Sequence, residues 1–281
     1  MTQPIEDTVR AAVQGDRHAL EALVKRVQDD VYQLARRMLW NPADAEDATQ
    51  EILVRIVTNL GSFRAECAFS TWVFRVACNH LLNTRKSAME RRALTLEQFG
   101  EAVEDSILDP AADQPLEPER VALAKEVMVA CTSGMLLCLD RDHRVAYILG
   151  EIVGFEGDEA AAILEVSPGA FRKRLSRARA RIRDFMEAHC GLVNEDARCR
   201  CERQIGPATA KGRIDATALP LTSGPERHPE HPSLVESIRE MGELHRSVRV
   251  FRGHPDHAAP QSILAHFRAL LDSGRFRILS N

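Results

Sequence analysis

The stretch EAAAILEVSPGAFRKRLSRARARIRDFM, residues 159–186, decides the fold of its part of the chain. Its apolar residues recur at helical spacing and predict one buried stripe on a helix over 168–186. These residues are Phe171, Leu175, Ala178 and Ile182. Ser167 is suited to cap that helix, and Pro168 to occupy its first position. A short helix over 159–164 and a three-residue turn precede it, so the stretch has the pattern of a helix-turn-helix.

Basic side chains surround the buried stripe of the second helix. They are Arg172, Lys173, Arg174, Arg177, Arg179, Arg181 and Arg183. In a helix-turn-helix the second helix enters the major groove of DNA, and its N-terminal residues meet base edges. We therefore expect base contacts from Arg172, Lys173 and Ser176. Phosphate contacts are expected from Arg174, Arg177 and Arg179. The alternative is a solvated basic helix packed on a bundle.

The composition agrees with a helical protein made of small domains. The chain has 281 residues, 5% aromatic residues and a formal net charge of -4. This length suits two or three small domains, and the scarcity of aromatic residues favours helices over sheets. No apolar run approaches the ~20 residues of a membrane span. The N-terminus lacks a signal-peptide core, so we expect a cytoplasmic protein. Seven cysteines, an odd number, argue against a secreted disulfide framework.

Apolar stripes predict a bundle of helices over residues 8–86. Asn41 and Pro42 end one helix and begin the next. The polar residues near the start of that next helix are Asp44, Glu46, Asp47, Gln50 and Glu51. Taken alone, this pattern indicates carboxylates that complement the helix dipole. A polar loop over 62–70 leads into a helix over 71–86, in which we expect Trp72 to belong to the core.

The remainder of the chain alternates between linkers and helices. Residues 96–119 are acidic and contain three prolines but no Lys or Arg, which predicts a flexible linker. Residues 120–188 are expected to be helical. A stretch rich in Gly, Pro, Thr and Ala over 206–232 predicts a second linker. Two amphipathic helices should follow, with apolar residues at Leu234, Val235, Ile238, Met241 and Leu244 in one, and Ile263, Leu264, Phe267, Leu270 and Leu271 in the other.

A cysteine cluster marks the start of the C-terminal part. His189, Cys190, Cys199 and Cys201 contain the ligand types of a tetrahedral zinc site, although the spacing is unusual for one. The alternative is a structural bend that caps the preceding helix. The other cysteines, expected to be small core residues in helical segments, are Cys67, Cys78, Cys131 and Cys138.

Two groups of motifs, in this order, resemble an extracytoplasmic-function sigma factor of the sigma-70 family. The first comprises DAEDATQEI (44–52) and FSTWVFRVACN (69–79), which are similar to sigma region 2. The second comprises LDRDHRVAYIL (139–149), EAAAIL (159–164) and GAFRKRLSRAR (169–179), which are similar to sigma region 4. The fold expected from this resemblance is all-α, with two small helical domains joined by an acidic linker and followed by a short helical extension. The expected boundaries are region 2 at 8–90, the linker at 91–118, region 4 at 119–189, a Cys-rich junction at 190–205 and the extension at 206–281.

The resemblance implies a role for each matching position. Binding to the clamp coiled coil of core RNA polymerase is implied for Asp44, Glu46, Asp47, Gln50 and Glu51. Contact with the promoter −10 element is implied for Phe63, Arg64, Phe69, Ser70, Arg75, Asn79 and Asn83. Contact with the −35 duplex is implied for Pro168, Gly169, Arg172, Lys173, Arg174, Ser176, Arg177 and Arg179. The acidic linker is implied to lie in the RNA-exit path as a nucleic-acid mimic.

Some positions depart from the family pattern and bear on promoter sequence rather than on class. They are Cys78, Asn83, the pair Asp140-Arg141, and residues 154–158. The extension lies outside the minimal family pattern, and we expect it to fold back on the sigma domains and modulate them. An anti-sigma factor is a further candidate partner, whereas neither membrane insertion nor a small-molecule substrate is expected.

Three classes of function are compatible with a DNA-binding segment. The first is a sigma factor, which directs core polymerase to promoters and is not an enzyme. The second is a repressor or activator that uses the helix-turn-helix without being a polymerase subunit. An enzyme fused to a DNA-binding segment is the third, but the sequence contains no nucleophile elbow, phosphate loop or paired metal motif. The region 2 motifs favour the first class.

Overall fold

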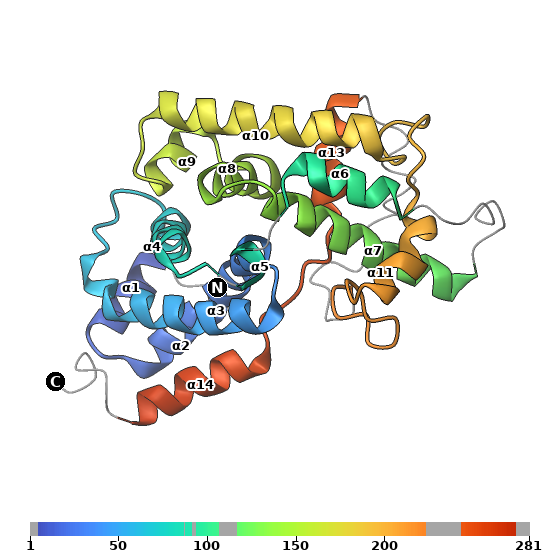
Figure 1. Cartoon of the computed structure of the whole chain (residues 1–281). Helices are drawn as coiled ribbons and strands as arrows, with labels where there is room; N and C mark the ends of the chain where they lie inside the picture. Colours follow the sequence, from blue (N-terminus) through green and yellow to red (C-terminus); the bar gives the residue numbers. More distant parts are fainter. Residues whose placement is uncertain (1–4, 87, 92–93, 107–116, 223–242, 274–281) are drawn as a thin grey trace. The chain divides into compact units, whose positions relative to one another are not determined.

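The computed structural model describes residues 5–86, 88–91, 94–106, 117–222 and 243–273 (Figure 1). The regular elements in these ranges are helices, and one isolated β-bridge joins Cys190 to Cys199. The prediction of an all-α fold is therefore confirmed.

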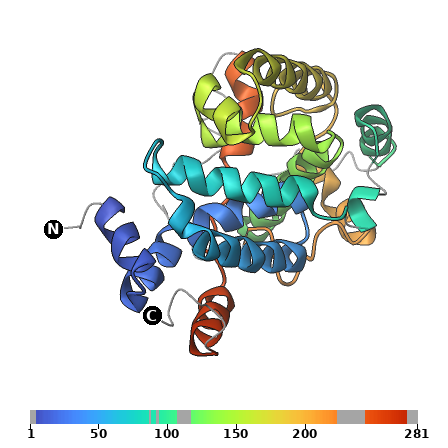
Figure 2. The ribbon, with the colours of Figure 1, turned by 90° about the vertical axis from the view of Figure 1, so that its left-hand side faces the viewer.

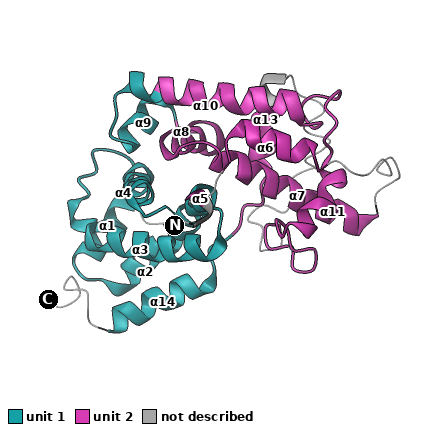
Figure 3. Ribbon diagram, viewed as in Figure 1, with its two compact units in different colours: residues 1–87, 156–171, 258–281 teal, residues 88–155, 172–257 magenta. Residues whose placement is uncertain are grey.

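The chain forms two compact units, which Figure 3 shows in different colours. Unit 1 contains residues 1–87, 156–171 and 258–281, and unit 2 contains residues 88–155 and 172–257. Each unit thus gathers segments that are far apart in the sequence. The five domain boundaries expected from the sequence follow the chain rather than its packing, so they stay a prediction.

Unit 1 is built on four α-helices at the N-terminal end of the chain. They are α1 (Ile5–Val13), α2 (Arg17–Leu39), α3 (Pro42–Thr58) and α4 (Phe69–Asn83), with a 3-10 turn η1 (Leu60–Ser62) after α3. The side chain of Asp16 accepts the His18 N–H at 2.8 Å and so caps α2. The side chain of Asn41 accepts the Ala43 N–H at 2.8 Å and caps α3, which begins at Pro42 as predicted.

The apolar stripes of these helices meet in one core. Its largest fully buried side chains are Leu20, Leu34, Met38, Ile52, Leu53, Ile56, Leu60 and Leu81. Trp72 is 8% exposed, as expected of a core residue. Its ring contacts those of Phe63 and Phe69, with centroids 5.8 Å away in both cases. The aromatic cluster therefore joins the loop before α4 to the start of that helix.

Two later helices complete unit 1. α9 (Gly157–Ile163) packs on α4, where the hydroxyl of Thr71 donates to the Glu159 carboxylate at 2.6 Å. α14 (Gln261–Asp272) packs along α2 and α3, as Figure 1 and, from another side, Figure 2 show. α14 coincides with the second of the two amphipathic helices predicted for the extension, which is confirmed.

Unit 2 contains the rest of the described helices. They are α5 (Ala88–Arg91), α6 (Leu96–Glu104), α7 (Pro118–Leu137), α8 (Arg141–Tyr147), the π-helix η3 (Ile148–Val153), α10 (Pro168–His189), the 3-10 helix η4 (Cys201–Gln204), α11 (Ile205–Ala210) and α13 (Glu243–Arg252). The first four residues of α10 belong to unit 1. As predicted, α10 begins at Pro168, and it continues three residues beyond the predicted end.

Part of the predicted acidic linker is a helix. Residues 96–104 form α6, which begins with a capping box in which the Thr95 hydroxyl accepts the Gln98 N–H and the Gln98 side chain accepts the Thr95 N–H. Leu96, Phe99 and Val103 are buried. The expectation of a flexible segment was wrong here, because the acidic residues lie between apolar positions at helical spacing. Residues 107–116 of the predicted linker lie outside the described residues.

The second predicted linker is also partly packed. Its first residues form α11, and Ile214 and Leu221 are buried. The carboxylate of Glu126, on α7, accepts the Leu221 N–H at 2.8 Å and the Thr222 hydroxyl at 2.7 Å. The flexible interpretation is therefore wrong for residues 206–222, which a buried carboxylate attaches to α7. Residues 223–242, and with them most of the first predicted tail helix, lie outside the described residues.

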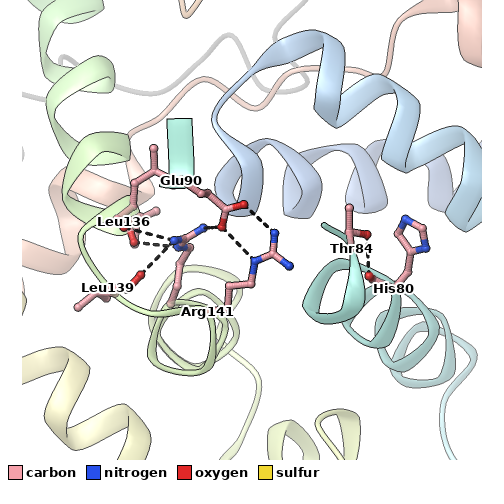
Figure 4. A network of polar contacts seen from close by, with 8 residues as sticks. His80, Thr84, Glu90, Leu136, Leu139 and Arg141 are labelled. Carbon is pink, nitrogen blue, oxygen red and sulfur yellow. Dashed lines mark hydrogen bonds and ion pairs between the residues drawn. The ribbon is translucent and has the colours of Figure 1, made fainter. Parts of the chain in front are cut away.

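A buried ion network connects α5 to α8 inside unit 2 (Figure 4). The carboxylate of Glu90 accepts from Arg141 Nη2 at 2.6 Å and from Arg144 Nη1 at 2.9 Å. Arg144, 2% exposed, also donates to the carbonyl oxygens of Leu136 at 2.9 Å and Leu139 at 3.0 Å. Although burial opposes it, hydrogen bonding and charge from the two arginines lower the pKa of Glu90 to about 2. Every charge in this network thus has a partner.

Candidate functional site

The turn between α9 and α10 has the geometry of a helix-turn-helix. The Val166 N–H donates to the Ala161 carbonyl at 3.1 Å, and Glu165 has a φ of 55°, in the left-handed region. The hydroxyl of Ser167 accepts the Ala170 N–H at 3.2 Å, so Ser167 caps α10 as predicted. The chain thus reverses sharply and starts the second helix at a fixed residue.

The helix α10 has the predicted buried apolar side and the predicted exposed basic side. The four residues of its apolar stripe, Phe171, Leu175, Ala178 and Ile182, are buried. The predicted base-contacting residues Arg172, Lys173 and Ser176 are exposed, as are Pro168 and Arg177. The basic face therefore extends from the first turn of the helix, the part that meets base edges in this motif.

Two of the basic residues on α10 pair with acidic residues on other helices of unit 2. Arg174 Nη2 lies 2.9 Å from Asp142 Oδ2, and the guanidinium of Arg179 pairs with Glu151. Both were expected to contact phosphates. Arg174 is half-buried, whereas Arg179 is exposed like Arg172, Lys173 and Arg177, so ion pairing rather than burial distinguishes it from them.

The acidic residues on α3 lie on the outside of unit 1. Asp44, Asp47 and Glu51 are exposed, whereas Glu46 and Gln50 are half-buried. Glu51 Oε2 lies 3.7 Å from Nε2 of His80 on α4, and Glu46 accepts a hydrogen bond from the Ser262 hydroxyl on α14. Buried residues of α3 lie between these acidic positions in the sequence and on the opposite side of the helix. The predicted protein-binding residues thus share one helix, and one of them contacts the extension.

The residues expected to contact the −10 element fall into different environments. Arg64, Ser70 and Asn83 are exposed, and Phe63, Arg75 and Asn79 are half-buried. Phe69 is buried, because its ring stacks on Trp72. It therefore supports the loop from within rather than presenting a face to a base.

A carboxylate from the helix-turn-helix reaches one of these positions. The Asn79 side-chain amide donates to Glu165 at 3.1 Å, eight residues after Thr71 donates to Glu159. Both acceptors are exposed or half-buried acids in the segment that unit 1 contributes to the helix-turn-helix. No sequence pattern indicated these contacts, since the partners are more than 80 residues apart.

The cysteine cluster contains a residue that the sequence spacing did not reveal. Cys131 on α7 interacts electrostatically with Cys190 and Cys199, and Cys201 with all three. Burial is the main cause that raises the pKa of each thiol, and it brings that of Cys199 to about 12. The raised pKa values favour protonated thiols. Cys131 lies on α7, Cys190 directly after α10, Cys199 in the following loop and Cys201 at the start of η4.

The backbone explains the close approach of two of these cysteines. The Gly191 N–H donates to the Cys199 carbonyl at 3.0 Å, which forms the isolated bridge between Cys190 and Cys199. A Cβ at Gly191 would lie 2.5 Å from that carbonyl oxygen, so only glycine fits there. The Arg200 guanidinium donates to the Glu195 carbonyl at 2.8 Å and closes the loop.

His189 is not part of this cluster. Its Nδ1 lies 2.6 Å from Glu104 Oε1, and its ring covers Gly100 on α6. As the side chains lie, the described part of the chain contains no group of three or more His, Cys, Asp or Glu placed to hold a metal ion. The expected helical positions hold for Cys78 on α4 and Cys131 on α7, whereas Cys138 follows the last residue of α7 and Cys67 lies in the loop before α4. None of the helices in the described ranges is long and apolar enough to cross a membrane.

Comparison with known proteins gives two family matches. Sigma-70 region 2 matches residues 23–91, and sigma-70 region 4 matches residues 131–182. Among solved structures, CnrH in complex with the cytosolic domain of CnrY has 24% sequence identity and a TM-score of 0.45, covering 64% of this chain and 96% of that one. The sigma factor RpoE in complex with the anti-sigma factor NepR from Bartonella quintana has 24% identity and a TM-score of 0.40, covering 59% and 95%.

Curated relatives are sigma factors from several bacteria. The RNA polymerase sigma-H factor of Pseudomonas aeruginosa is 29% identical over 63% of this chain and 91% of the relative. The ECF RNA polymerase sigma factor SigW of Bacillus subtilis is 28% identical over 65% and 97%. The ECF RNA polymerase sigma-E factor of Escherichia coli is 30% identical over 65% and 95%. With both conserved regions in order and nearly the whole length of these relatives covered, the chain belongs to the extracytoplasmic-function (ECF) sigma factors of the sigma-70 family.

Proposed function

We propose that this chain binds core RNA polymerase and directs transcription initiation through contacts with promoter −10 and −35 elements. The observation that supports it most is the presence of regions 2 and 4 in one chain and in that order. A repressor or activator needs only the helix-turn-helix. The proposed activity needs no catalytic side chain, and it takes place in the cytoplasm, where polymerase acts.

Region 4 would read the −35 duplex with the first turns of α10. Arg172, Lys173 and Ser176 are exposed there and suit base edges, and Arg177 suits a phosphate. Arg174 and Arg179 would have to exchange Asp142 and Glu151 for phosphates. Because that exchange loses an ion pair for each one gained, we expect these two arginines to contribute less to DNA affinity than Arg177.

Region 2 would hold the opened −10 strand with the loop over 63–70 and one side of α4. Single strands are bound by basic side chains along the backbone and by aromatic faces for the bases. Arg64 is exposed, and Phe63 is the half-buried member of the aromatic cluster, so these two fit the requirement. Asn79 would have to leave Glu165 before its amide could contact DNA.

Transcription from a randomised promoter library with reconstituted holoenzyme tests this proposal. The wild-type chain should enrich one pair of −35 and −10 sequences. Arg172→Ala and Lys173→Ala should relax the −35 preference and leave the −10 preference in place. Arg183→Ala is a matched control, because Arg183 lies on the same helix and pairs with Asp184 at 2.9 Å. No enriched pair, or specific DNA binding without any affinity for core polymerase, would overturn it in favour of a plain repressor or activator.

The sequence left zinc binding and a structural bend open for this cluster. We also propose that zinc binds the four thiols of Cys131, Cys190, Cys199 and Cys201 without His189. The electrostatic interaction of Cys201 with Cys131, Cys190 and Cys199 supports this set, and His189 is held by Glu104. Binding would require the thiols to turn toward one point and to lose their protons. Zinc content per purified chain should then fall in Cys131→Ser but not in the control Cys67→Ser, and equal content in both would refute the ligand set.

A further inference from the structure

The C-terminal helix α14 lies on unit 1 in a defined register. Asp272 Oδ1 lies 2.5 Å from Nη2 of Arg17, Arg268 donates to Glu21 at 3.1 Å, and the Ala259 N–H donates to Asp29 at 2.8 Å. As the residue numbers increase along α2, the numbers of their partners in the C-terminal segment decrease. The two helices are therefore antiparallel, and three contacts over about three turns of α2 fix one alignment.

An apolar row faces α2 and α3 beneath these polar contacts. Ile263, Phe267 and Leu271 are spaced by four residues and are 1%, 2% and 4% exposed. Residues on the other side of α14, such as Ala265 and His266, are exposed. An amphipathic helix of twelve residues is marginal by itself in water, so this burial is what holds α14 in place.

The covered surface overlaps the one assigned to polymerase. Glu46 on α3 accepts a hydrogen bond from Ser262 at the start of α14, and α14 packs along α3 as well as α2. Glu46 belongs to the helix face for which core-polymerase binding was expected. A bound α14 and a protein partner of that face would therefore compete for the same carboxylate and the surface around it.

We propose that α14 is a built-in competitor of core RNA polymerase, seated on the α2–α3 face of region 2 and displaced when polymerase binds. The inference rests on the proposed function, because it concerns a helix that core polymerase must displace before it can bind. The ion pairs at the edge of α14 are exposed and therefore weak, which leaves the apolar row as the main attachment. If the competent state is a fraction of the population, the apparent dissociation constant for polymerase rises by the inverse of that fraction.

The test measures the affinity of the full-length chain for core RNA polymerase in three forms. Phe267→Asp places a charge in the buried row and should detach α14, and Ala265→Asp places the same charge on the exposed side of the same helix. Truncation is less suitable, because residues before α14 pack on α7 in unit 2. Amide hydrogen exchange of α14 and of α3 accompanies each measurement. It shows whether α14 has left the surface and whether the bundle has stayed folded.

We expect Phe267→Asp to bind core polymerase roughly tenfold or more tightly than the wild type, with lost protection in α14 and retained protection in α3. Ala265→Asp should behave as the wild type. Equal affinities despite a detached α14 would overturn the inference while leaving the proposed function intact, and weaker binding by Phe267→Asp would instead make α14 part of the binding surface. If none of the forms binds core polymerase, the proposed function itself fails. Should Phe267→Asp unfold α3, Ile263→Ser provides the same measurement with a smaller change.

Discussion

The ion pairs of the two units differ in what they hold in place. In unit 2 Glu90 lies between Arg141 and Arg144 with almost no exposure of its side chain, and all three groups are hydrogen-bonded. In unit 1 the pairs of Arg17 with Asp272 and of Arg268 with Glu21 lie at the surface. A buried network that loses one partner retains uncompensated charge, whereas a surface pair returns to water at little cost. The buried Glu90 network is therefore suited to a permanent connection within unit 2. The surface pairs are suited to a helix, α14, that polymerase displaces.

The largest effect should come from neutralising Glu90. Glu90→Gln keeps the shape of the side chain but leaves the charges of Arg141 and Arg144 without their counter-ion. We expect unit 2 to lose about 3 kcal/mol of its free energy of unfolding. Denaturant unfolding with hydrogen exchange in α7 and α8 measures it. Glu101→Gln, at an exposed position on α6, is the control, and a loss as small as that of the control would show that the network is not a permanent connection.

Acid should remove the same connection at low pH. Because the folded-state pKa of Glu90 is about 2, below its ordinary value of 4.5, its contribution is fully present above pH 4.5. The contribution decreases as the pH falls from about 4.5 toward 2. We expect the stability difference between the wild type and Glu90→Gln to be constant above pH 5 and to shrink over that interval. A difference that does not change down to pH 2.5 would contradict the assignment.

Much of the fold could be predicted from local patterns, and the rest depended on distant partners. Asn41, Ser167 and the stripe through Phe171 act within a few residues, so the helices of regions 2 and 4 and the turn between α9 and α10 followed from the sequence. Residues 96–104 and 206–222 were predicted wrongly as linkers. The first is short and strongly acidic, and the second is held by Glu126, about 95 residues away.

The candidate sites divide in the same way. The exposed basic residues of α10 followed from helical periodicity. Phe69 is buried by its contact with Trp72, and His189 pairs with Glu104 instead of joining the cysteines. Cys131 joins the cluster through Cys190 and Cys199, which come much later in the sequence. Long-range pairs of this kind leave no periodic signal in a single sequence.

A smaller effect is expected at Glu126, another buried carboxylate of unit 2. Glu126→Ala leaves the Leu221 N–H and the Thr222 hydroxyl without their acceptor, which should cost about 2 kcal/mol. Glu126→Gln retains one carbonyl oxygen for the N–H and an amide that can donate to the hydroxyl, so it should cost much less. Hydrogen exchange at 214–222 distinguishes the two variants. Equal effects would mean that the charge, rather than the hydrogen bonds, holds this segment on α7.

The smallest effect on stability should follow from removing a surface pair of α14. Arg268→Ala deletes the hydrogen bond to Glu21, and an exposed pair of this kind contributes less than about 1 kcal/mol. Global unfolding should therefore barely change. Opening of α14 is a local event with its own, smaller free energy, so the same loss should speed hydrogen exchange within 261–272 by up to about fivefold while α3 is unaffected. High salt should reduce the difference between the wild type and Arg268→Ala, because it screens the pair in the wild type and leaves the apolar row in both. If α3 and α14 instead exchange together in the wild type, α14 is a fixed part of unit 1, and the contrast between its surface pairs and the Glu90 network concerns exposure alone.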